Sequence, residues 1–196
     1  MRRRTLGFLL GVLCLVGASA EVAEAQALRQ YVQGQVVGIG GRRAGLNRPF
    51  SLLINNVTSA DDVAQLNQAL RGGGQEELLR TLSRLNAGRI TVGNNVGVRA
   101  NAIIASPAAE GGTKLTVLYE RNVAIFELRY GTRSADYRFG YAEIFLDSRG
   151  QGQGTFIPAA KVRLEGDNNW VVEDFAEFPA RLLGLRARGN AVGGAR

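Results

Sequence analysis

The sequence predicts an α+β fold that is mainly β: an antiparallel sandwich or partly closed barrel of about nine strands with one inserted two-helix hairpin. Most of the aromatic and β-branched residues between Thr113 and Leu164 fall in short blocks separated by polar residues and glycines. That pattern is typical of an antiparallel meander. A helical period appears only in residues 59–87. The helices are therefore expected to cover one end or face of the sheet.

Two blocks of the meander predict a β-hairpin. Alternate positions of residues 137–146 form two faces that are both apolar, so we expect this strand to lie centrally in the sheet. Residues 155–164 alternate with one polar face. The link Asp147–Gly150 supplies an Asx-type turn start and a glycine for a positive φ. Pro158 has no amide hydrogen for the strand ladder, which predicts a bulge or an edge there.

The remaining segments are predicted from their periods. Residues 28–39 and 49–57 alternate as strands and predict an opening hairpin. Ser59 with Asp62 resembles a helix start, Gly72–Gly74 is expected to stop that helix, and a second helix is expected from Gln75. Together they predict a helical hairpin over about 59–87. Further strands are predicted at residues 89–92, 96–105, 168–175 and 179–188.

The first residues predict export. Arg2–Arg4 form a basic start, residues 6–16 are apolar, and small residues recur at alternate positions up to Ala25. This pattern is typical of a secretory signal peptide over residues 1–25. We expect one globular domain over residues 26–188 and a flexible tail over 189–196, located in the periplasm or outside the cell. A membrane span is not expected after cleavage, because the apolar run is shorter than the roughly 20 residues that a bilayer requires.

Composition excludes several kinds of catalysis. The chain has no histidine, and its one cysteine, Cys14, lies in the predicted signal peptide. Serine–histidine–aspartate and cysteine–histidine catalysis therefore lack their bases, and zinc sites built on imidazole or thiolate lack their ligands. We predict no metal site and no cofactor.

Carboxylates are the remaining candidates for catalysis, with Glu143 and Asp147 considered first. Glycoside hydrolysis requires two carboxylates about 5 to 10 Å apart in one cleft. The alternative interpretation is that Asp147 is a turn residue and that Glu143 is a solvated residue on a strand. The sequence leaves both interpretations open.

Aromatic residues of the meander are candidates for ligand binding. They include Tyr119, Phe126, Tyr137 and Tyr141, which either line an apolar cup or belong to the core. The chain is basic, with a formal net charge of +7. Its arginines either hold a polyanion or form a solvated surface. Nucleic acid is not an expected partner, because export removes the protein from it.

Three pieces of the chain also carry a resemblance. The run VAQLNQALRGGGQEELLRTLSRLNAGRITVG, at residues 63–93, is followed by FELRYGTRSADYRFGYAEIFLD and GQGTFIPAAKVRLEG. Together they resemble a group of exported bacterial proteins of unknown function, over nearly the whole chain after the signal peptide. The resemblance implies a secreted or periplasmic protein and implies no activity, cofactor or catalytic residue.

These observations predict a non-enzymatic exported module that binds a small apolar ligand or an envelope component. The signal peptide, the missing catalytic residue types and the aromatic meander support this prediction. The alternative is a carboxylate-dependent hydrolase that acts on envelope or extracellular polymers.

Overall fold

The computed structural model describes residues 30–41, 44–108, 111–121, 136–167 and 169–189. The predicted signal peptide, residues 190–196 of the predicted tail and Phe126 lie outside these residues. The described elements are β1 (Gln30–Gly38), β2 (Asn47–Ile54), α1 (Ala60–Leu82), β3 (Gly88–Val92), β4 (Val98–Ala100), β5 (Ala102–Pro107), β6 (Thr113–Glu120), β7 (Phe139–Leu146), β8 (Gln151–Glu165), β9 (Asn169–Phe175) and β10 (Ala180–Arg188). The fold is mainly β, as predicted.

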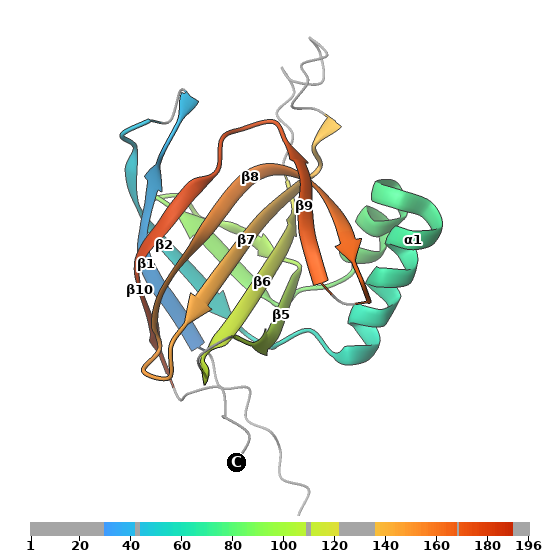
Figure 1. The fold of residues 1–196 in the computed structure, drawn as a ribbon, viewed down its shortest axis with the longest axis horizontal. Coiled ribbons are helices and arrows are strands. Elements are labelled where there is room, and N and C mark those ends of the chain that lie inside the picture. The colour runs from blue at the N-terminus through green and yellow to red at the C-terminus, as the bar shows by residue number, and fades with distance from the viewer. Residues whose placement is uncertain (1–29, 42–43, 109–110, 122–135, 168, 190–196) are drawn as a thin grey trace, which may run out of the picture.

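The described strands form a single antiparallel sheet. Its order is β4-β3-β2-β1-β10-β8-β7-β6-β5, and β9 pairs with β8 outside this path, which makes a sheet of ten strands. The two end strands, β4 and β5, follow each other in the chain with only Asn101 between them. Because two extended residues span at most about 7 Å, the sheet must curl until its two ends meet (Figure 1). The sheet is curled but its strand path does not close.

The curled sheet separates two hydrophobic layers. Its inner face encloses the main core, with Leu52, Val117 and Ile144 fully buried at its centre. A second layer lies between the outer face of the β5–β8 side and the elements that cover it, α1 and β9. Figure 1 shows α1 on this side, with β1, β2 and β10 on the opposite side. Both faces of β7 are therefore apolar, and β7 lies between β6 and β8, as its sequence predicts.

The predicted pair of helices is a single kinked helix. Ser59 caps its start, because the Ser59 hydroxyl accepts a hydrogen bond from the amide of Asp62 at 3.1 Å. Gly72 and Gly73 are helical, and only Gly74 leaves the helical region, with φ 63° and ψ −152°. The structure assigns one helix across this kink, so the predicted hairpin of two separate helices is not shown. The chain changes direction at one glycine without a connecting loop, and Leu66 and Leu78 on either side of it enter the same apolar layer.

The β7–β8 hairpin confirms the turn prediction. The amide of Asp147 donates to the carbonyl of Gln151 at 2.8 Å, and Gly150 has φ 72°. The register between β7 and β8 shifts next to Pro158, which confirms the predicted bulge. In the part of the chain that the structure describes, no helix is both long enough and apolar enough to cross a bilayer.

The predicted strand over residues 96–105 is wrong as a single element. It is divided at Asn101 into β4 and β5, which lie at opposite ends of the sheet. Inward-facing positions occur at Val98 and Ala100 before Asn101 and at Ile103 after it, so the alternation shifts by one residue there. The shift lets the chain leave one sheet edge and begin the other.

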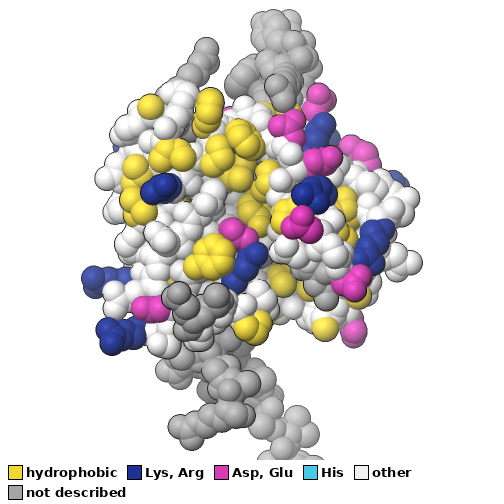
Figure 2. Space-filling view, viewed as in Figure 1, with side chains coloured by type: hydrophobic (Ala, Val, Ile, Leu, Met, Phe, Trp, Pro, Cys, Tyr) yellow, Lys and Arg dark blue, Asp and Glu magenta, His cyan; other side chains and the backbone are white. Residues whose placement is uncertain are grey.

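Charge is divided between the two sides of the sheet. Strands β1, β2, β3, β4 and β10 contain no aspartate or glutamate, whereas α1 and β6–β9 all contain at least one. Figure 2 shows most of the visible acidic side chains on the right, where α1 and β9 lie. The β1–β10 side carries arginine and uncharged polar side chains instead.

Candidate functional site

An open cavity of about 510 Å³ lies at the end of the curled sheet that holds the β3–β4 turn. Its apolar walls come from inward-facing residues of four strands and from Pro158: Ile90, Val92, Val98, Tyr119 and Phe156. Arg121, Glu177 and Asn95 complete its rim. We refer to this space as the mouth cavity. Its volume lies in the range of roughly 300 to 1,000 Å³ that ligand pockets have.

Small residues on neighbouring strands make room for the two aromatic rings of the cavity. Tyr119 on β6 pairs with Gly140 on β7, and a Cβ added to Gly140 would lie 1.9 Å from Cζ of Tyr119. The Tyr119 ring therefore lies directly over the glycine. Phe156 pairs with Ala142 on one side and Ala180 on the other. Both rings are thus held by strand pairing and not by a loop.

The rim of the mouth cavity carries both signs of charge. Nη1 of Arg121 donates to the carbonyl oxygen of Tyr137 at 3.1 Å, which attaches the Arg121 side chain to the chain just before β7. Glu177 lies in the connection between β9 and β10. Val96 at the tip of the β3–β4 turn has 86 % of its surface exposed. An apolar interior below a polar rim suits a molecule with an apolar body and a polar end.

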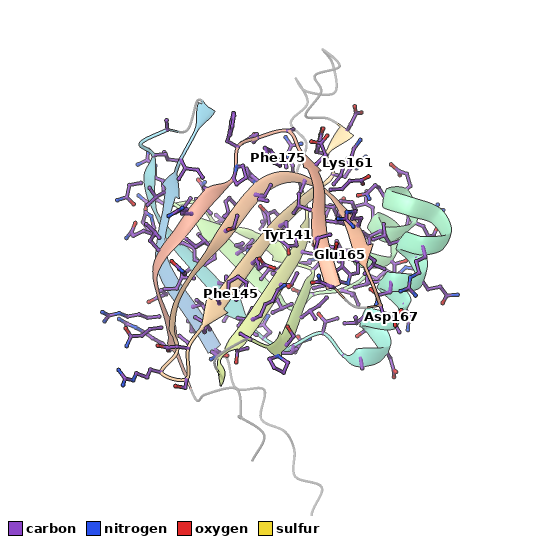
Figure 3. The ribbon with its side chains drawn as sticks, in the orientation of Figure 1. Tyr141, Phe145, Lys161, Glu165, Asp167 and Phe175 are labelled. Atoms are coloured by element: carbon purple, nitrogen blue, oxygen red, sulfur yellow. The ribbon has the colours of Figure 1, made fainter. Side chains whose placement is uncertain are left out.

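The predicted aromatic ligand residues do not meet in one place. Tyr119 faces the mouth cavity, whereas Tyr137 and Tyr141 lie outside the main core. The Tyr137 hydroxyl donates to Oδ2 of Asp174 at 2.5 Å. Tyr141, labelled in Figure 3, lies under β9, and its hydroxyl donates to the carbonyl of Trp170 at 3.1 Å. Phe126 falls outside the described residues.

The two predicted carboxylates are also apart. Oε1 of Glu143 forms an ion pair with Nζ of Lys114 on β6, at 2.6 Å. Asp147 sits in the β7–β8 turn, where its Oδ1 accepts hydrogen bonds from the amides of Arg149 and Gln151, each at 2.8 Å. Four residues of extended chain separate their Cα atoms by about 13 Å, and each carboxylate is held by different partners. The bonds of Asp147 match the turn interpretation.

Because Tyr141 is buried, its phenol makes the free energy of unfolding depend on pH in the alkaline range. Desolvation by burial, followed by the nearby Glu143 carboxylate, raises the pKa of the Tyr141 phenol well above its ordinary value of about 10. The unfolded chain then loses this proton first as the pH rises, so the stabilisation is complete below about pH 10 and is lost progressively above it.

We therefore expect Tyr141→Phe to flatten the fall of the unfolding free energy above about pH 10, by up to about 1.4 kcal/mol per pH unit. Urea unfolding at a series of alkaline pH values measures this slope. Identical slopes for the two proteins would contradict the assignment of alkaline sensitivity to Tyr141.

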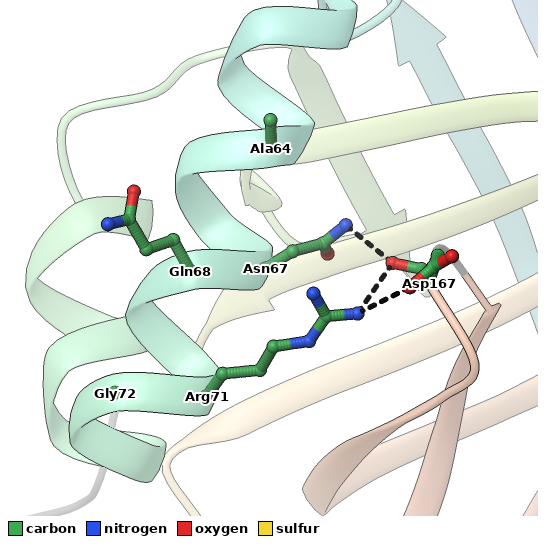
Figure 4. Close-up of a pocket in the computed structure, with 6 residues that line it drawn as sticks. All are labelled: Ala64, Asn67, Gln68, Arg71, Gly72 and Asp167. Atoms are coloured by element: carbon green, nitrogen blue, oxygen red, sulfur yellow. Dashed lines mark hydrogen bonds and ion pairs between the residues drawn. The ribbon is translucent and has the colours of Figure 1, made fainter.

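A second depression, of about 470 Å³, lies between α1 and the β8–β9 turn (Figure 4). Nδ2 of Asn67 donates to the carbonyl of Asp167 at 2.9 Å, and Nη2 of Arg71 contacts Oδ1 of the same residue at 3.1 Å. These bonds attach the turn to the helix. The polar groups of this depression thus serve the fold, and the mouth cavity is the better candidate for a binding site.

Sequence reasoning did not identify the cavity walls on β3 and β4 or the rim residues. One signal was available, because Leu115, Val117, Tyr119 and Arg121 lie on one face by the alternation of β6. The change from apolar to charged at Arg121 marks the end of the core. No cluster of three or more carboxylates able to hold a metal ion occurs among the described residues.

Comparisons of the chain with protein-family models, curated proteins and solved structures find no match. The class of protein is therefore defined by the fold and the cavity alone: a mainly β domain with a curled antiparallel sheet and, at one end, an open cavity with apolar walls and a charged rim. The resemblance to exported bacterial proteins stays a prediction.

Proposed function

We propose that this chain is an exported, non-enzymatic module that binds a small apolar ligand in the mouth cavity. The observation that supports this proposal most directly is the apolar wall of the cavity, which is built from inward-facing residues of strands on both sides of the curled sheet. The proposal that it is exported rests on the signal-like pattern of residues 1–25.

Burial of apolar ligand surface would favour binding in the mouth cavity. Each square ångström of apolar ligand surface removed from water contributes about 25 cal/mol, and the half-buried side chains of Val92 and Val98 are the wall residues that a ligand can cover. The rim residues Arg121 and Asn95 can orient a polar end of the ligand. The ligand class is therefore an apolar molecule with one polar end. The hydrolase alternative gains no support from the separate positions of Glu143 and Asp147.

A pair of neighbouring substitutions on β3 tests the proposal. Val92 faces the cavity, whereas Thr91 faces outward, because successive residues of a strand point to opposite faces. Binding of the neutral apolar dye N-phenyl-1-naphthylamine is measured by its fluorescence. Val92→Phe places a ring in the cavity and is expected to weaken binding by about tenfold or more, which corresponds to about 1.4 kcal/mol.

Thr91→Phe adds the same ring on the other face and serves as the matched control. It is expected to leave the dye affinity within about twofold, or about 0.4 kcal/mol. Equal weakening by both variants, or no saturable binding by the unaltered protein, would rule out the mouth cavity as the binding site. Thermal unfolding of both variants verifies that each is folded.

A further inference from the structure

A strip of arginines and glutamines follows β10 on the outer face of the sheet. β10 lies between β1 and β8 in the sheet. The register places Gln33 of β1 and Gln151 of β8 on either side of Arg186, and Tyr31 of β1 next to Arg188. We define the β10 strip by its exposed outward residues on these three strands: Tyr31, Gln33, Gln35, Gln151, Gln153, Arg181, Leu183, Arg186 and Arg188.

A β-bulge in β10 aims these arginines outward. Leu182 and Leu185 both face the main core, although they are three residues apart. The register shifts between them, and Gly184 has φ 60°. A bulge inserts one residue and re-aims the side chains that follow it. Without it, regular alternation from Leu182 would turn Arg186 and Arg188 toward the core.

The strip carries positive charge from its three arginines. Among the described residues, Arg181, Arg186 and Arg188 form no ion pair with an acidic side chain. β10 and β1 contain no acidic residue. Arg186 and Arg188 lie about 7 Å apart at their Cα atoms, and the strip extends for about 20 Å along the strand. Like charges at this spacing repel each other, so an anionic partner would relieve the repulsion.

We propose that the β10 strip binds an acidic polysaccharide. Guanidinium groups pair with carboxylate or sulfate groups through two parallel hydrogen bonds. Glutamine side-chain amides both donate and accept hydrogen bonds, as the hydroxyl groups of a sugar also do. The exposed ring of Tyr31, 41 % accessible, offers an apolar face beside Arg188. The arginines of the strip are arranged in a line along one strand, so a linear polymer with regularly repeated negative groups can contact several of them at once.

Two other anionic partners fit the strip less well. A lipid surface is held by contiguous apolar side chains as well as by charge, and Tyr31 and Leu183 are the only apolar members of the strip as defined. Single-stranded nucleic acid is bound by bases stacked on successive aromatic side chains, and the strip holds one aromatic residue. This proposal concerns a face outside the mouth cavity and does not depend on the dye-binding site.

Matched triple variants test the proposal on the full chain. The first is Arg181→Gln, Arg186→Gln and Arg188→Gln on the strip. The control is Arg80→Gln, Arg84→Gln and Arg163→Gln, which removes the same charge from exposed positions on the α1 and β8–β9 side. Binding to polygalacturonate and to heparin is measured by calorimetry at low ionic strength, with neutral dextran as the uncharged comparison.

The strip variant is expected to weaken binding to both acidic polymers by about 30-fold or more, since each charged hydrogen bond contributes about 1 kcal/mol or more. The control is expected to change affinity by less than about threefold, and neutral dextran should not bind. N-phenyl-1-naphthylamine affinity should stay unchanged in the strip variant, which separates this result from the cavity proposal.

Three results would contradict the proposal that the strip binds an acidic polysaccharide. Equal weakening by both triple variants would show that net charge alone attracts the polymer. Tighter binding to phosphatidylglycerol vesicles, lost in the strip variant, would assign the strip to a lipid surface. Tighter binding to single-stranded DNA, lost in the same variant, would assign it to nucleic acid.

Discussion

Replacing Asn101 with alanine is expected to lower the free energy of unfolding by about 3 to 5 kcal/mol. Asn101 is 2 % exposed, and its side chain serves three backbone groups. Nδ2 donates to the carbonyl oxygens of Leu82 and Leu85 at 3.1 and 3.2 Å, and Oδ1 accepts from the amide of Glu120 at 2.9 Å. Alanine would remove this partner from the Leu85 carbonyl and the Glu120 amide, at a cost of about 1 to 3 kcal/mol for each buried group, whereas the Leu82 carbonyl also accepts from the amide of Leu85 at 3.0 Å.

The position of Asn101 in the fold makes this loss large. It joins β4 to β5 where the two ends of the sheet meet, and its bonds attach the end of α1 to β6 at the same point. Urea unfolding followed by circular dichroism measures the effect. Asn86→Ala, at an exposed position near the end of α1, is the control and is expected to change stability by less than about 0.5 kcal/mol. A loss below about 1 kcal/mol for Asn101→Ala would contradict the role assigned to its side chain.

Leu78→Ala is expected to destabilise the protein by about 3 to 4 kcal/mol. Leu78 follows the kink in α1, is fully buried, and belongs to the same layer as Trp170. Removing a buried leucine side chain costs its transfer free energy and leaves a cavity, for a total of about 2 to 5 kcal/mol. The helix depends on this contact, because isolated helices of about a dozen residues are marginal in water.

Trp170 is the only tryptophan of the chain, so its fluorescence reports on this layer during unfolding. The control is Glu76→Ala, an exposed position on the same segment of α1, with an expected change of less than about 0.5 kcal/mol. If the two substitutions cost the same, the packing of α1 on the sheet does not stabilise the fold as the structure implies.

Local signals predicted much of this fold because local chemistry determines it. Ser59 caps a helix, and Asp147 with Gly150 forms a turn, through atoms a few residues apart in the chain. The glycines at 72–74 correctly marked an interruption of the helix at Gly74, but Gly72 and Gly73 stay helical although glycine lowers helix stability by about 1 kcal/mol. Leu66 and Leu78, on either side of Gly74, pack into the same apolar layer, so the two segments cover the sheet together.

The mouth cavity could not be predicted in the same way. Its walls combine Val92, Tyr119 and Phe156, which belong to three strands that are distant in sequence. Only the curl of the sheet brings them together, and the curl depends on the path of the chain at Asn101. The aromatic meander was a correct signal for strands but not for a shared site, because alternation sends Tyr119 inward and Tyr141 outward.

The short length of β4 has a consequence for association between copies of the chain. A free strand edge exposes amide and carbonyl groups to which another chain can add a strand, and long flat edges are therefore prone to aggregation. β4, at one end of the sheet order, has only three residues, and the chain turns from it straight into β5. This edge therefore offers an incoming chain few backbone groups on which to add a strand.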